Sequence, residues 1–203
     1  MYHFVLPLLF SFFQGAGPEN ALPAVLSADD RVKLDAANIS AAVKEFVEAD
    51  SSKLTLFESK DGRIRLYSDS RSREAKDIFK LCEAMLNKLD ATLGVMPAAE
   101  GESAELLGFV INKPATYFDL CDVVAEAAES QARFMESSKK ITGFTIFAPE
   151  LTVYFHDPTF QMEASIDHSV AHSLIHLELQ RRYGELPLWI REGIATALED
   201  MTV

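Results

Sequence analysis

The stretch that decides the fold is DHSVAHSLIHLELQRRYGELPLWIREGIATALED, residues 167–200. Apolar residues recur with a helical period over residues 165–183, with Ser165 as a candidate N-cap and Gly184 as a typical residue after a helix end. Pro187 suits the first turn of a second helix, because its missing N–H costs nothing there. So short a connection predicts that the second helix returns beside the first.

Three of the five histidines, His168, His172 and His176, recur every four residues in this stretch. Residues four apart share one face of a helix, so two such imidazoles can reach one metal ion with bonds of about 2.0–2.1 Å. Glu192, one turn into the second helix, is expected to approach the open side of the His172–His176 pair. Two histidines and a carboxylate with a vacant position are typical of a catalytic zinc site. Three roles remain open for His168: a fourth metal ligand, a partner that contacts one of the ligands, or a polar residue at the helix start.

The upstream sequence predicts a mixed order of strands and helices. Asp61 and Gly62 separate two strand-like runs and predict a hairpin. Further elements are expected as a short helix from Ser40, an amphipathic helix ending at Gly94, a strand over 106–112, a long helix from Pro114 to residue 137, and two strands within 142–157. This order favours an α+β fold, a small mixed sheet with helices packed largely on one side.

The amino-acid composition limits the functions that this chain is expected to have. The chain has 203 residues and a net charge of −12, which argues against a nucleic-acid binder that neutralises phosphates and disfavours an anionic membrane surface. Residues 1–17 contain an apolar run of about ten residues, half a bilayer span, which predicts a secretory signal peptide rather than a membrane helix. That segment lacks Lys and Arg, so an apolar segment docked on the domain is the alternative. With a signal peptide, residues 18–39 are expected to form a linker to a single domain over 40–203. The expected location is then the cell exterior or the cell envelope.

The two cysteines, Cys82 and Cys121, each lie on the apolar face of a predicted helix. They are expected to be buried thiols. A single disulfide bridge is the alternative if the protein is exported.

The segment VAHSLIHLELQRRYGELPLWIREGIATALE resembles the active-site segment of the gluzincin zinc metallopeptidases. It is most similar to a bacterial group of secreted peptidase-like domains with the pattern H-E-x-x-H, a short basic stretch, Gly, Pro, then W-[LI]-x-E-G-[LI]-A. The resemblance implies a zincin-like domain in which His172, His176 and Glu192 bind one zinc ion. It also implies that the strand in residues 151–157 is a sheet edge that pairs with an extended peptide.

The sequence departs from this pattern at Ser173, where the family has the glutamate that acts as general base. A serine hydroxyl is not basic near neutral pH, and general acid–base help contributes about 10²–10⁴-fold to a rate. Glu178 does not replace the base, because it lies about 200° around the helix from His176. By the same helical geometry, Asp167 lies about 140° around the helix from the row of His172, so it does not replace the base either.

The chain also ends at Val203, just past the ligand helix, where the family usually continues, so we expect a truncated cleft. The remaining candidates for hydrogen-bond donors at the site are Tyr154, His156 and Tyr183. Tyr154 and His156 share one face of a strand, and a solvent-exposed outer face explains them equally simply.

Three interpretations remain open. The first is a metallopeptidase-like domain that keeps its zinc but is weakly active or inactive. The second is an active metallohydrolase that draws its base from elsewhere. The third is a module that binds no metal and is not an enzyme.

Overall fold

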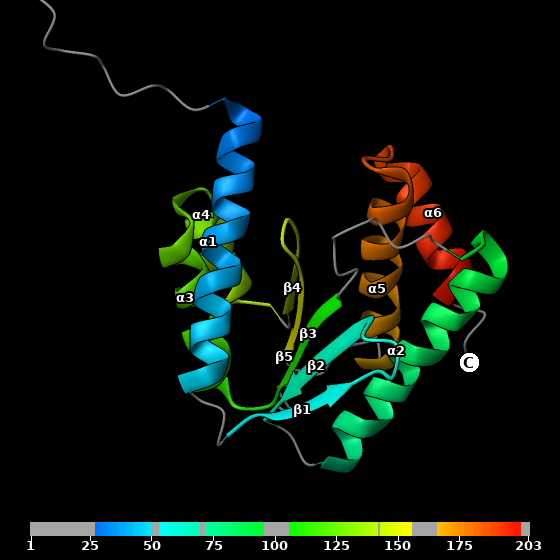
Figure 1. Ribbon diagram of the computed structural model, residues 1–203, viewed down its shortest axis with the longest axis horizontal. Coiled ribbons are helices and arrows are strands. Elements are labelled where there is room, and N and C mark those ends of the chain that lie inside the picture. Colours follow the sequence, from blue (N-terminus) through cyan, green and yellow to red (C-terminus); the bar gives the residue numbers. More distant parts are fainter. Residues whose placement is uncertain are drawn as a thin grey trace, which may run out of the picture.

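The computed structural model describes residues 27–49, 53–69, 72–95, 106–141, 143–155 and 166–199, which form a mixed sheet between two layers of helices (Figure 1). The sheet has five strands in the order β1-β2-β3-β5-β4, with parallel pairing in the centre and an antiparallel pair at each edge. The strands are β1 (Thr55–Glu58), β2 (Ile64–Ser68), β3 (Leu106–Ile111), β4 (Gly143–Phe147) and β5 (Glu150–Phe155). The predicted α+β class is confirmed.

The hairpin of β1 and β2 forms where Asp61 and Gly62 predict it. Gly62 has a φ of 71°, a conformation that a side chain disfavours. The carboxylate of Asp61 accepts hydrogen bonds from the Ser59 hydroxyl at 2.6 Å and from the Arg63 amide at 3.2 Å. These two bonds fix the turn and therefore the register of both strands.

Helices cover both faces of the sheet, so the expectation that they pack largely on one side was wrong. The central strands explain this, because alternate residues of β3 enter two different cores. Val110 packs with helices α2 (Ser72–Leu93), α5 (Ile166–Tyr183) and α6 (Leu188–Glu199). Phe109 and Ile111 pack on the other face with α1 (Ala28–Ala49), α3 (Pro114–Ala127) and the short α4 (Ala132–Ser138). Figure 1 shows the two layers on opposite sides of the strands.

Two of the predicted helices differ from those observed. The first helix starts at Ala28, not at Ser40, and Ser27 caps it by accepting a hydrogen bond from the Asp30 amide at 3.1 Å. Residues 28–39, expected in a linker, are therefore helical. The long helix from Pro114 breaks at Ala128, which is buried and extended (φ −145°), and a 3-10 turn at Glu129–Gln131 leads into α4. The break turns Met135 of α4 into the core.

Both cysteines are free and buried, as expected. Cys82 belongs to the core on the α2 side of the sheet, and Cys121 to the core on the α3 side. The sheet separates them, which excludes the alternative of a disulfide between them in this fold. Within the described ranges, no helix has the length and apolar character needed to cross a bilayer.

Candidate metal centre

The histidine pair lies on α5, whose last residue is Tyr183. Gly184 follows it directly, as the sequence predicts. Gly184 adopts a φ of 67° and its amide donates to the Gln180 carbonyl at 2.8 Å, which closes the last turn. The side chains of His172 and His176 are 30% and 12% exposed. Their Nε2 atoms lie 2.8 Å apart, so both rings aim at one point.

Glu192 reaches the same point from α6. The turn at residues 184–187 sends α6 back along α5, and Pro187 accepts the first hydrogen bonds of the new helix, from the amides of Ile190 and Arg191. The two carboxylate oxygens of Glu192 lie 3.2 Å from His172 Nε2 and 3.4 Å from His176 Nε2. The predicted approach of Glu192 to the pair is thus observed.

The three side chains fit a divalent metal ion. Ligand atoms around a tetrahedral zinc with bonds of about 2.0–2.1 Å lie about 3.3 Å apart. The two histidine nitrogens lie 2.8 Å apart, and each lies near a different oxygen of the Glu192 carboxylate, at 3.2 and 3.4 Å, so the separations are close to that value. Among the described residues, this is the one group of three or more potential ligands that lies close enough to hold an ion. With 44% of the Glu192 side chain exposed, a further position would face solvent.

The electrostatic surroundings keep His176 in the neutral form that a metal requires. Burial lowers the pKa of His176, the charges of His172 and Arg191 lower it further, and Glu192 opposes them only in part. Binding through Nε2 would put the proton on Nδ1. That atom is buried and finds no hydrogen-bond partner among the residues that the structure describes.

Ser173, at the position where the gluzincin pattern has a glutamate, is half-buried. Its side chain adjoins the Tyr154 hydroxyl. Tyr154 is only 5% exposed, and its hydroxyl donates a hydrogen bond to the Val170 carbonyl at 3.1 Å. The prediction that Tyr154 lies on a solvent-exposed strand face is therefore wrong. The hydroxyl therefore steadies α5 against β5. Tyr183 is 52% exposed at the end of α5, whereas His156 and the side chain of His168 lie outside what the structure describes.

The strand before α5 is not a sheet edge, which corrects the expectation for residues 151–157. β5 pairs with β3 on one side and with β4 on the other. The edge strand β4 contacts a residue beside the metal centre through its last residue, Phe147. The guanidinium carbon of Arg191 lies 5.5 Å from the centre of the Phe147 ring.

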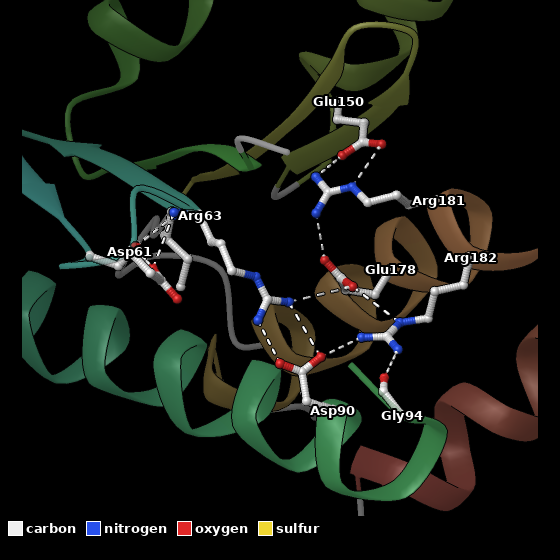
Figure 2. Close-up of polar contacts among 10 residues, drawn as sticks. Asp61, Arg63, Asp90, Gly94, Glu150, Glu178, Arg181 and Arg182 are labelled. Atoms are coloured by element: carbon white, nitrogen blue, oxygen red, sulfur yellow. Dashed lines mark hydrogen bonds and ion pairs between the residues drawn. The ribbon is translucent and has the colours of Figure 1, made fainter. Parts of the chain in front are cut away.

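Glu178 faces away from the histidines, as its helical position predicts, but its surroundings were not foreseen. It is fully buried and pairs with Arg181 at 2.7 Å and Arg182 at 3.3 Å (Figure 2). The network extends to further partners in the hairpin turn before β2, on α2 and on β5: Arg63, Asp90 and Glu150. Three guanidinium groups and three carboxylates balance, and they hold the back of α5 against the sheet.

Arg191 is the residue beside the metal centre that sequence reasoning missed. It occupies the variable position of the W-[LI]-x-E-G pattern, so the resemblance gives it no role. Its Nε atom is buried, lies 4.0 Å from the Glu192 carboxylate and has no hydrogen-bond partner in the described part of the chain. The only available signal was its place next to Glu192, which does not reveal the direction of a long side chain.

Comparisons of the chain with protein-family models, with curated proteins and with solved structures found no match. The assignment of the centre therefore depends on its own geometry.

Proposed function

We propose that the chain is a zinc metallopeptidase-like protein with a single metal ion held by His172, His176 and Glu192 and without a general-base glutamate. The observation that carries this proposal is the convergence of two imidazoles and one carboxylate from two helices, with one ligand atom of each within 4.8 Å of the others. Two imidazoles and one carboxylate with an open position are the donor set of catalytic zinc sites. Other divalent metals accept the same donors, so the identity of the ion is part of the proposal.

Zinc bound in such a site acts as a Lewis acid and lowers the pKa of a coordinated water to about 7. The protein's own groups would add little to proton transfer. Ser173 is not a base, and the Tyr154 hydroxyl already donates to the helix backbone. We therefore expect weak peptide hydrolysis or none, with metal binding retained.

An extended peptide is the substrate or ligand that suits the surroundings. β4 has one neighbour among the described strands, so no other described strand pairs with its outer row of N–H and C=O groups, and we propose this edge as the place where a peptide pairs. Arg191 contacts the end of β4 beside the centre. As part of the proposal the protein acts outside the cytoplasm, in keeping with the apolar residues near its start.

Metal stoichiometry tests the proposal directly. Purified protein is dialysed against trace zinc, freed of excess metal and analysed by plasma mass spectrometry. We expect about one zinc per chain in the wild type and almost none in His172→Ala or Glu192→Ala. Zinc at a hundred times its dissociation constant should stabilise the wild type by about 2.7 kcal/mol, and neither variant.

Glu126→Ala is the matched control, because Glu126 is an exposed carboxylate on α3, on the opposite side of the sheet. It should load zinc like the wild type. A wild type without zinc would contradict the proposal and favour a module that binds no metal. Equal zinc in the wild type and both ligand variants would place the ion elsewhere.

A further inference from the structure

The arginines around the metal centre differ in how closely they pair with carboxylates. Three arginines behind α5, Arg63, Arg181 and Arg182, each lie within a hydrogen bond of one or more carboxylates. Arg191, on the side of the histidines, has a different environment. Among the described residues its one ionic partner is Glu192, at 4.0 Å, which is the outer limit of an ion pair.

The position of Arg191 is held by two neighbours rather than by a counter-ion. It lies in the first turn of α6, one residue before the proposed ligand Glu192. Its guanidinium sits over the ring of Phe147 on β4, a cation–π contact. The side chain is 24% exposed, so the group can still be reached from solvent.

A bound metal ion would increase the local positive charge. A divalent ion with two neutral imidazoles and one carboxylate carries a net charge of +1, and it takes up the carboxylate that Arg191 faces. Arg191 then lacks a counter-ion beside a cationic centre. The chain's net charge of −12 does not offset this. Charges more than about 8 Å away are largely screened at physiological ionic strength.

We propose that Arg191 is a specificity-determining residue that binds a carboxylate of the ligand while another group of that ligand occupies the metal centre. This inference rests on the proposed metal site and adds a substrate class to it, peptides with a carboxylate close to the metal-binding group. Guanidinium suits this task, since its fork of N–H donors matches the two oxygens of a carboxylate. Phe147 holds the fork at the end of the edge strand, where an extended peptide would pass.

Two hydroxamates that differ in one group test the inference on zinc-loaded protein. Succinic acid monohydroxamate carries a free carboxylate, and its amide has the same shape without the charge. Titration calorimetry should show that the wild type binds the carboxylate about tenfold or more tightly than the amide. Arg191→Gln should reduce this ratio to about one, and Arg191→Lys should retain part of it.

Arg133→Gln, an exposed arginine on α4, is the control and should keep the wild-type ratio. Equal binding of both hydroxamates by zinc-loaded wild type, or a ratio unchanged in Arg191→Gln, would overturn the role of Arg191 and leave the metal site standing. Failure of the wild type to load zinc would overturn both proposals.

A second pair of probes identifies the source of the carboxylate. One is a peptide hydroxamate with a free C-terminus and no acidic side chain, and the other has a glutamate side chain and an amidated C-terminus. Preference for either one, lost in Arg191→Gln, supports the inference and names the source. If the loss of Arg191 weakens neither probe, the inference is wrong.

Discussion

At the scale of single residues, Ser173 separates metal binding from catalysis. The two histidines and Glu192 form a compact group without any contribution from residue 173. Ser173 lies beside the Tyr154 hydroxyl, and a serine at this position supplies no carboxylate base to the proposed centre. In the proposed function, the site therefore keeps a set of metal ligands while residue 173 offers no group that moves the proton.

Ser173→Glu should restore the missing base. We expect the zinc-loaded variant to cleave a quenched fluorescent peptide about 10²–10⁴-fold faster than the wild type, because a positioned general base contributes that factor. Ser173→Gln is the control, since it has the same length and no basicity. If both variants hydrolyse at the wild-type rate, residue 173 does not face the reacting group. Strong, chelator-sensitive hydrolysis by the wild type would mean that another residue supplies the base.

At the scale of elements, local sequence signals predicted a hairpin and a helix end correctly, but the Ser27 cap at the start of α1 was missed. Asp61 and Gly62 gave the hairpin, and Gly184 gave the end of α5. The His172–His176 pair follows from helical spacing alone. Glu192 was foreseen because the turn before α6 is too short to send the helix elsewhere.

The other errors arose where tertiary packing determines the structure. The break at Ala128 has no glycine or proline to mark it, and it is stabilised by the burial of Met135. The two-sided core follows from β3 and β5, whose nearly continuous apolar runs signal burial on both faces. Arg191 could not be placed from sequence, because its direction depends on Phe147, more than forty residues earlier.

The turn between α5 and α6 should control metal affinity through the position of Glu192. Gly184→Ala puts a side chain at a φ of 67°, although the added methyl would meet no atom within 4 Å. We expect a loss of about 1 kcal/mol in the free energy of unfolding and weaker zinc binding, because the strain loosens the turn. Chemical denaturation and zinc titration measure the two effects.

Gly193→Ala provides the matched control inside α6. Its added methyl also meets no atom within 4 Å, and its φ is not positive. This change should stabilise the protein by up to about 1 kcal/mol, since alanine favours a helix. If the two variants lose equal stability, the conformation of Gly184 is not what holds the turn.

At the scale of the whole molecule, the buried charge network joins the sheet to the back of the proposed metal helix. Glu178→Gln keeps the size of the side chain and leaves three arginines facing two carboxylates. We expect a loss of about 3–5 kcal/mol in the free energy of unfolding, the usual effect of breaking a buried ion pair. Glu58→Gln, which alters a half-exposed pair with Arg65, should cost less than about 1 kcal/mol. Equal losses in the two variants would show that burial does not strengthen the network.

The same network sets the lower of two pH ranges in which stability changes. Burial raises the pKa of Asp90, but hydrogen bonds from Arg63 and Arg182 outweigh it and hold the pKa below its ordinary value. The folded protein therefore keeps this carboxylate ionised after the unfolded chain, with a pKa of about 3.9, has begun to take up a proton. The stability that Asp90 contributes is present above that value and is lost as the pH falls through the pKa of the folded state.

His176 sets the upper range, in the metal-free protein. Its pKa in the folded state is lowered, chiefly by burial, while an unfolded chain takes up a proton at about pH 6.5. Below about pH 6.5 the unfolded chain gains that proton first, so stability falls until the pH reaches the pKa of the folded state. Urea unfolding in the presence of a chelator should show this fall between pH 7 and 5, and a shallower one in His176→Gln. Parallel curves for the two proteins would mean that His176 takes up its proton at the same pH in the folded and unfolded states. Zinc added to the wild type should flatten its curve, because the metal keeps the imidazole neutral.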